Sequence, residues 1–285
     1  MNAAFRPDRI RGFWLLARPN NLAIAFPAIL VGGIVSGAEL KWLPLLLAAV
    51  SGIFMGAGAN AINDYYDLEI DRINKPNRPL PAGLLTRRDA RVFATVAFLA
   101  GIAVAVFINW ICLSIALISA VLLVLYSRSL KKTVLLGNLT VAFMLGLALV
   151  YGGLAVGGMR NAAAVGLFSF LYNLAREILK DADDMEGDMT QGADTFPIRY
   201  GIRASLVLVT VVLLLLVAAT VVPYSLGWFS RTYLWIVAVG VDAVVFGFIV
   251  SMWRKPEPGH LGRLAVWMKA DMLAGLAAVY FGGNP

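Results

Sequence analysis

Residues 60–83, NAINDYYDLEIDRINKPNRPLPAG, follow a long apolar run and carry three carboxylates at spacings of three and four residues, Asp64, Asp67 and Asp71. An α-helix turns by about 100° per residue, so Asn60 and the three aspartates fall within an arc of roughly 60°. If the apolar run is a membrane helix, its end points a side-chain carbonyl oxygen and three carboxylates along one line.

A second stretch, residues 173–201, repeats this pattern in the sequence NLAREILKDADDMEGDMTQGADTFPIRYG. Its aspartates keep the spacing of three and four, at a constant offset of 117 residues from the first triplet: Asp181, Asp184 and Asp188. Glu177 stands at the place of Asn60. Two acidic helix faces in corresponding halves of a chain predict one catalytic site, with the triplets facing each other across a central cavity.

The composition is that of a polytopic membrane protein. Of 285 residues, 60% are hydrophobic and only 14% are charged, whereas soluble domains carry about a quarter charged residues. The single cysteine, Cys112, excludes a disulfide framework, and the single histidine, His260, excludes a multi-histidine metal centre. The net charge of +7 would suit a nucleic-acid partner. Membrane topology explains it better, so no nucleic acid is expected.

Segments of about 20 apolar residues, enough to cross a bilayer, recur nine times. They predict an all-α polytopic membrane protein with nine transmembrane helices in a bundle. The predicted spans are 19–37, 43–66, 90–107, 109–126, 134–154, 162–181, 203–223, 232–252 and 263–282. The chain, 1–285, is expected to form a single domain of two pseudo-repeats, 10–126 and 127–250, followed by the last helix. Eight helices with one re-entrant segment are the alternative.

Lysine and arginine gather on one side of this predicted topology. The loops of that side contain Arg72, Lys75, Arg78, Arg128, Lys131, Lys132, Arg254, Lys255 and Arg263, among others. The opposite loops contain only Lys41, Arg160 and Arg231. Because positive loops stay in the cytoplasm, we expect a multi-pass protein of the cell membrane, with its N-terminus and both acidic motifs on the cytoplasmic side.

Carboxylates at a membrane boundary are costly and tend to be functional. A solvated helix end is the plain alternative, but it does not explain two matching triplets. Asp183 and Glu186 fall on other faces of the second helix and are expected to be solvated. Mg²⁺ is held by carboxylates together with substrate phosphates, and the helix rises about 10 Å from Asp64 to Asp71, too far for one ion. The triplets are therefore expected to hold two or so Mg²⁺ ions around a diphosphate, which makes C–O cleavage feasible.

Basic residues accompany the acidic motifs on the same predicted side. Arg72 and Arg78 follow the first motif, and the segment YSRSLKK, residues 126–132, follows the fourth apolar span. Arginine can bind phosphate oxygens through a bidentate fork and lysine as a point charge. Together these residues predict a diphosphate site, although each basic residue taken alone is better explained as a positive-inside anchor.

The segment NDYYDLEIDRINKPNRPLPAG resembles the first signature, NDxxDxxxD, of the UbiA superfamily of intramembrane prenyltransferases. YSRSLK and KDADDMEGD resemble its tyrosine–lysine and second aspartate signatures, and the match spans nearly the whole chain in order. The resemblance implies a nine-helix membrane fold with an acidic cavity under a cytoplasmic cap. There a prenyl diphosphate, bound through Mg²⁺, gives its allylic carbon to a lipophilic acceptor. The expected metal-binding and catalytic residues are Asp64, Asp67, Asp71, Asp181, Asp184 and Asp188. The expected substrate-binding residues are Arg18, Asn21, Asn60, Asn63, Arg72, Arg78, Tyr126, Arg128, Lys131, Glu177 and Lys180.

Within the family, INKPNRPLPAG and REILKDADDMEGDMTQGADTFPIRYG are most similar to the digeranylgeranylglyceryl phosphate synthase branch. That branch joins a second geranylgeranyl chain to geranylgeranylglyceryl phosphate in ether-lipid synthesis. Chlorophyll synthases and quinone-forming members share much of the first motif, so chlorophyllide or a quinone-precursor ring remains an alternative acceptor. A lipid or ion transporter is the alternative of another class. Aspartates at helix ends, rather than at the membrane midplane, favour the enzyme.

Overall fold

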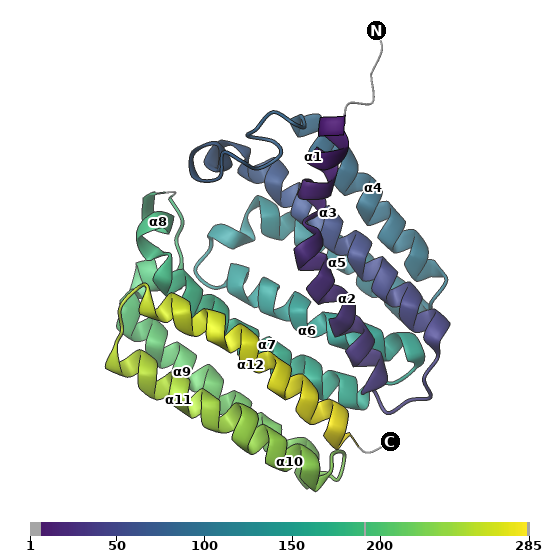
Figure 1. Ribbon diagram of the computed structural model, residues 1–285, viewed down its shortest axis with the longest axis vertical. Coiled ribbons are helices and arrows are strands. Elements are labelled where there is room, and N and C mark those ends of the chain that lie inside the picture. Colours follow the sequence, from purple (N-terminus) through teal and green to yellow (C-terminus); the bar gives the residue numbers. More distant parts are fainter. Residues whose placement is uncertain (1–6, 191, 284–285) are drawn as a thin grey trace. The chain divides into compact units, whose positions relative to one another are not determined.

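The computed structural model describes residues 7–190 and 192–283, which are helical and contain no strand beyond an isolated bridge between Phe229 and Gly283 (Figure 1). The elements in chain order are α1 (Pro7–Ala17), α2 (Pro19–Ile34), α3 (Trp42–Asn74), α4 (Arg87–Val106), α5 (Trp110–Arg128), the 3₁₀ turn η1 (Leu130–Lys132), α6 (Leu136–Val156), α7 (Arg160–Asp183), α8 (Met185–Thr190), α9 (Phe196–Ser225), α10 (Arg231–Val237), the π-helical segment η2 (Ala238–Asp242), α11 (Ala243–Arg254) and α12 (His260–Gly282).

The membrane-spanning character of these helices agrees with the sequence. Eight helices among the described residues are long and apolar enough to cross a membrane, counting α10 to α11 as one. A ninth span arises if α1 and α2, bent by 41° at Arg18, are taken together. The first span is predicted at 19–37, but helix α2 is shorter and ends at Ile34. Large apolar side chains remain exposed on α5, among them Ile118 and Val121, as expected for a surface that faces lipid.

The second span differs most from its predicted boundary. Hydropathy falls after Tyr66, where the acidic residues begin, but α3 continues to Asn74. No helix breaker occurs until Lys75, which leaves the helical region with φ −141° and is followed by Pro76. The first acidic motif is therefore part of an uninterrupted helix of 33 residues.

One compact unit of the fold comprises residues up to Leu30 together with Lys41–Ser129. In it α3 packs on α4 and α5, and α1 packs on α3 (Figure 1). The loop between α3 and α4 folds back onto this core, because the buried side chains of Leu80 and Leu85 join the cluster around Leu68 and Phe98. The loop is thereby fixed in position, and Arg78 with it.

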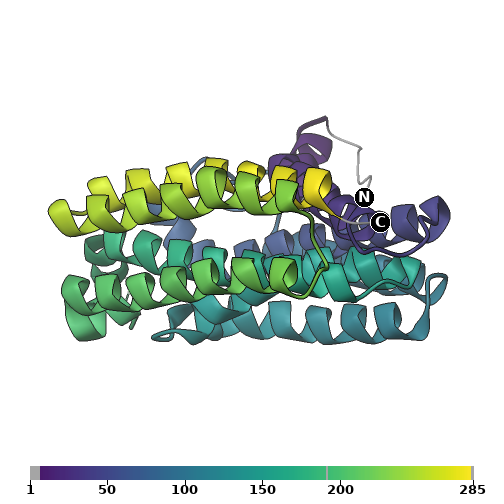
Figure 2. The ribbon, with the colours of Figure 1, turned by 90° about the horizontal axis from the view of Figure 1, so that it is seen from below.

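The other compact unit comprises Val31–Leu40 and the chain from Leu130 onward. Here α6 and α7 approach closely at Gly146 and Gly166, where a Cβ on Gly146 would lie only 2.5 Å from the carbonyl oxygen of Gly166. Helix α7 also packs on α9 and α12. Figure 2 shows α11 and α12 running side by side. The division into pseudo-repeats at residues 126 and 127 stays a prediction.

Candidate active site

The first acidic motif lies on one continuous helix, as the spacing predicted. Helix α3 carries all four residues of the motif, Asn60, Asp64, Asp67 and Asp71. The side chains of Asp64 and Asp71 are buried, and that of Asp67 is half-buried. Because an ionised carboxylate is costly to bury without a partner, the buried Asp64 and Asp71 require a positive charge or a metal ion nearby.

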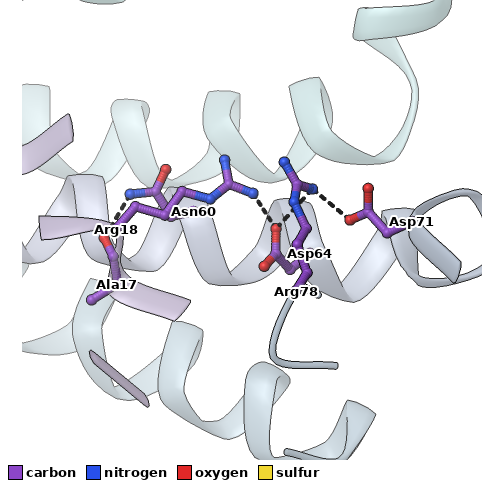
Figure 3. A network of polar contacts seen from close by, with 6 residues as sticks. All are labelled: Ala17, Arg18, Asn60, Asp64, Asp71 and Arg78. Atoms are coloured by element: carbon purple, nitrogen blue, oxygen red, sulfur yellow. Dashed lines mark hydrogen bonds and ion pairs between the residues drawn. The ribbon is translucent and has the colours of Figure 1, made fainter. Parts of the chain in front are cut away.

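Two arginines supply that charge (Figure 3). Arg78, from the loop after α3, donates from Nη1 to Asp71 Oδ2 at 2.5 Å and to Asp64 Oδ1 at 3.3 Å. Arg18 contacts the same oxygen of Asp64 through its Nη2. The two arginine side chains are about three-quarters buried, with an exposure of 25% for Arg18 and 21% for Arg78. Two carboxylates and two guanidinium groups thus form one compact, partly dehydrated network.

Arg18 occupies an unusual backbone conformation at the junction of α1 and α2. Its φ of 53° is left-handed, the only such value among non-glycine residues in the described part of the chain. A conformation of this kind costs free energy and tends to occur where the surrounding structure holds a functional residue in place. The amide nitrogen of Asn60 donates to the carbonyl oxygen of Ala17 at 2.8 Å, which ties the end of α1 to α3 beside Arg18.

The other expected residues of this unit are less involved. Arg72 is exposed and pairs with Glu69 at 2.8 Å, so the structure does not bring it to the aspartates. Asn21 is exposed in the first turn of α2, and Asn63 is half-buried on α3. Arg72 points elsewhere because it is one position beyond Asp71, about 100° around the helix.

The second acidic motif belongs to the other unit and differs from the prediction. Asp181 lies on α7 and accepts a hydrogen bond from Asn138 Nδ2 of α6 at 2.8 Å. Helix α7 ends at Asp183, so Asp184 is its C-terminal cap and Asp188 lies on the separate helix α8. The expectation that this triplet shares one helix face is therefore wrong.

The break has an electrostatic consequence. Several negative side chains at the C-terminus of a helix oppose its dipole, whereas the same charges are favourable in a first turn. Ending α7 at Asp183 places Glu186 and Asp188 in the first turn of α8. Burial, and then the neighbouring Asp184 carboxylate, raise the pKa of Asp188, while Lys180 acts in the opposite direction.

The remaining residues of this segment form local ion pairs. Glu177 contacts Arg176, which also donates from Nε to the carbonyl oxygen of Ala265 at 3.1 Å. Lys180 Nζ lies 3.4 Å from Asp184 Oδ2. Glu177 is thus held by its neighbour, which favours a structural pair at this position.

One expectation about the non-motif acids is wrong. Asp183 is half-buried, and its carboxylate contacts Gly262 in the first turn of α12, where a Cβ would lie 2.1 Å from Oδ2. Glu186 is exposed, as expected. Only Glu186 is therefore a suitable control for substitutions of the motif.

The basic segment after the fourth apolar span does not continue one helix. Tyr126 and Arg128 lie at the end of α5, whereas Lys131 lies on η1. Arg128 is exposed, and Tyr126 and Lys131 are half-buried. Thr133 Oγ1 donates to the carbonyl oxygen of Leu130 at 2.6 Å, which closes the turn that carries Lys131.

Sequence reasoning missed Asn138, the partner of Asp181. It is a buried amide in the first turn of an otherwise apolar helix. Buried polar groups are nearly always hydrogen-bonded, so a lone asparagine there was a signal for a polar partner. Nothing in the local sequence indicates that the partner is Asp181.

The chemistry of the acidic residues fits a hard divalent cation. All the candidate ligands are carboxylate or amide oxygens, the donors that Mg²⁺ prefers. Among the described residues no three acidic, histidine or cysteine side chains are already gathered as a metal cage. In the first motif the guanidinium group of Arg78 bridges Asp64 and Asp71, and that of Arg18 contacts Asp64. Such buried carboxylates can exchange one positive partner for another.

Residues 24–270 match the UbiA prenyltransferase family. The chain belongs to this family. It is therefore a prenyltransferase and a multi-pass membrane protein, and the transporter alternative finds no support.

Individual relatives agree with this membership. A digeranylgeranylglyceryl phosphate synthase of Methanopyrus kandleri (strain AV19) is 40% identical over 94% of this chain and 98% of its own length. A solved structure concerning digeranylgeranylglyceryl phosphate synthase in membranes has a TM-score of 0.87 at 32% identity and covers 96% of this chain and 98% of that one. A UbiA homologue from Archaeoglobus fulgidus, solved with DMAPP and Mg²⁺, has a TM-score of 0.73 at 20% identity, covering 94% and 99% of the two chains, and so shows the shared fold.

Proposed function

We propose that this prenyltransferase transfers a geranylgeranyl group from its diphosphate to geranylgeranylglyceryl phosphate, in a Mg²⁺-dependent reaction that yields an ether-linked lipid precursor. The observation that carries the proposal is the similarity, at 40% identity and nearly full length on both sides, to a digeranylgeranylglyceryl phosphate synthase. The acidic and basic groups of the first unit have the chemistry that a diphosphate substrate requires.

The proposed metal ligands are the six aspartates of the two motifs. Magnesium held by them would offset the negative charge of the diphosphate and so ease cleavage of its bond to the allylic carbon. The equal spacing of the triplets supports a shared role. The number of membrane spans between the motifs also supports a shared role. Three spans separate α3 from α7, so these two helices run in the same direction across a membrane.

Arg18 and Arg78 are proposed to bind the diphosphate itself. Both guanidinium groups already lie in a partly buried polar network, so little side-chain freedom is lost when they engage a substrate. A guanidinium that contacts a carboxylate can instead contact a phosphate oxygen, because the two acceptors have similar geometry. Lys131 and Tyr126 are proposed as further contacts, from the family motif that they match.

In this reaction the side chains have to stabilise the diphosphate leaving group. They do not have to provide a strong base. The bond between the allylic carbon and the diphosphate oxygen breaks, and an ether bond forms to the acceptor hydroxyl, which loses its proton. Positive side chains placed where negative charge develops on the diphosphate lower the barrier to breaking its bond to the allylic carbon. We propose that the active site faces the cytoplasm of the cell, where the lysine- and arginine-rich loops lie.

The test is a product assay. Purified protein would be incubated with geranylgeranyl diphosphate, geranylgeranylglyceryl phosphate and MgCl₂, and the lipid product identified by mass spectrometry. The expected product is digeranylgeranylglyceryl phosphate, formed with Mg²⁺ and not with excess EDTA. Prenylation of chlorophyllide or of a quinone-precursor ring, with no reaction of the glycerol lipid, would instead show one of the alternative acceptors.

A further inference from the structure

A groove lined by none of the motif aspartates runs along α11. Its walls are Phe246, Gly247, Val250, Ser251 and Arg254 of α11, the adjoining Lys255, and His260 at the start of α12, and its volume is about 500 Å³. We call these seven residues the α11 groove. Positions 246, 250 and 254 are spaced by four, and 247 and 251 likewise, so they share one helix face.

The groove is apolar at one end and basic at the other. Phe246 and Val250 form the apolar part and are each 48% exposed. Gly247 leaves open space beside them, since a Cβ there would meet no atom within 4 Å. About 12 Å further along the helix, the face ends at Arg254 and Lys255. One ligand could therefore contact both apolar and positively charged groups.

The net charge at the basic end of the α11 groove is about that of one cation. Lys255 pairs with Glu257 at 3.4 Å, whereas no acidic side chain in residues 7–190 and 192–283 pairs with Arg254. Beside Arg254, Ser251 Oγ and His260 Nε2 are hydrogen-bonded at 3.0 Å and offer further polar atoms. One uncompensated guanidinium next to a hydroxyl and an imidazole matches a phosphodiester, which carries one negative charge.

We infer that the α11 groove binds one anionic phospholipid of the surrounding membrane. The phosphate lies at Arg254, Ser251 and His260, and a hydrocarbon chain lies along Phe246, Gly247 and Val250. A free phosphate ion would leave the apolar part of the groove unused, and an uncharged lipid would leave Arg254 without a partner. Only an amphipathic anion complements both ends.

The depth of the two ends of the groove in the membrane also supports a lipid ligand. Helix α11 belongs to a predicted span that runs from Arg231 to Arg254, so its last residues lie at the end of the apolar stretch. Basic residues at such a boundary are placed at the level of phospholipid headgroups, and attract anionic lipids there. The apolar end of the groove lies inside the span, where lipid chains are.

The experiment measures binding of a fluorescent phosphatidylglycerol to the full-length protein in dodecyl maltoside. The comparison is phosphatidylcholine, a zwitterion whose choline cation offsets the charge of the phosphate. We expect saturable binding of phosphatidylglycerol that is clearly tighter than that of phosphatidylcholine. Arg254→Gln removes the charge-assisted contact and should weaken binding about tenfold. Arg263→Gln, a matched control, removes a similar charge from the exposed start of α12 outside the groove and should leave binding unchanged.

Gly247→Leu tests the apolar half without altering charge. The open space at Gly247 accepts a side chain without backbone movement, and leucine favours the helix more than glycine does. The leucine should fill the groove and weaken phosphatidylglycerol binding about tenfold or more, with the thermal midpoint of the protein unchanged or raised.

Four results would overturn the inference. These are wild-type affinity in both Arg254→Gln and Gly247→Leu, equal weakening in Arg263→Gln, equal binding of phosphatidylcholine, and displacement of the lipid by glycerol phosphate at comparable concentrations. The last would show a site for soluble phosphate esters, and the second a general charge effect. None of these measurements depends on the transfer reaction, so the outcome is independent of the proposed function.

Discussion

Arg78 and Asp71 meet at 2.5 Å, although the end of a helix and six residues of chain lie between them. The loop that carries Arg78 returns to α3 because Leu80 and Leu85 are buried in the core of the first unit. Asp64 accepts from the same guanidinium and from Arg18. A buried pair of carboxylates therefore depends on two side chains that also suit a diphosphate.

The first prediction concerns the metal ligands. Asp67→Asn removes a carboxylate charge while keeping the shape of the side chain, and we expect kcat to fall about 10²- to 10³-fold, because stabilisation of developing charge is lost. The matched control is Glu186→Gln, an exposed acid of the second motif region, which should keep near wild-type activity. Steady-state prenyl transfer at saturating Mg²⁺ is the measurement, and full activity of Asp67→Asn would refute the assignment.

The second prediction concerns Arg78. Arg78→Gln leaves Asp64 and Asp71 with less positive charge, and breaking a buried ion pair costs about 3–5 kcal/mol. We expect a lower thermal midpoint in EDTA, partly restored by Mg²⁺ because the cation can replace the lost charge, and a raised KM for the prenyl diphosphate.

Arg72→Gln is the control for that prediction, since Arg72 is exposed and pairs only with Glu69 among the described residues. Exposed pairs contribute about 0–1 kcal/mol. Equal destabilisation by the two substitutions, or an Arg78→Gln protein that Mg²⁺ does not stabilise, would contradict the network as a metal and diphosphate site.

The third prediction concerns the contact between α6 and α7, which places Asn138 beside Asp181. Gly146→Val introduces a Cβ where the carbonyl oxygen of Gly166 is only 2.5 Å away. Overpacking of this kind costs about 1–3 kcal/mol. Thermal unfolding in detergent should show a lower midpoint for Gly146→Val and no decrease for Gly247→Ala, where the added methyl group has open space. A midpoint unchanged in Gly146→Val would mean that the helices can separate at no cost.

The sequence was most informative where structure is local. Regular helix geometry alone placed Asn60, Asp64, Asp67 and Asp71 on one helix, and α3 confirms it. Hydropathy places the end of that helix at residue 66, too early, because the polar residues after Tyr66 continue the helix to Asn74. Helix periodicity also placed Asp181, Asp184 and Asp188 on one helix face, whereas α7 ends at Asp183 and Asp188 lies on α8.

Long-range pairing could not be predicted in the same way. Arg18 is 46 residues from Asp64, and Asn138 is 43 residues from Asp181. The family resemblance marked Arg18 as a candidate, but only the packing of the α1–α2 junction on α3 shows which carboxylate it contacts. Arg72 and Arg78 looked equivalent as basic residues, and the buried loop between α3 and α4 distinguishes them.

The last prediction concerns the order of bond breaking. Neither acidic motif has a histidine within it, and a glycerol hydroxyl is a weak nucleophile, so the rate must come from making the allylic carbon electrophilic. Arg18, Arg78 and Lys131 are the groups proposed to stabilise the departing diphosphate, which leaves a cation-like carbon for the hydroxyl to trap. A fluorine near the allylic carbon destabilises such a cation, and each 1.4 kcal/mol added to the barrier slows transfer about tenfold. We therefore expect single-turnover transfer from a fluorinated geranylgeranyl diphosphate to be at least about tenfold slower than from the parent, with similar binding. Equal rates, with chemistry shown to limit turnover, would mean that the hydroxyl attacks before the diphosphate leaves.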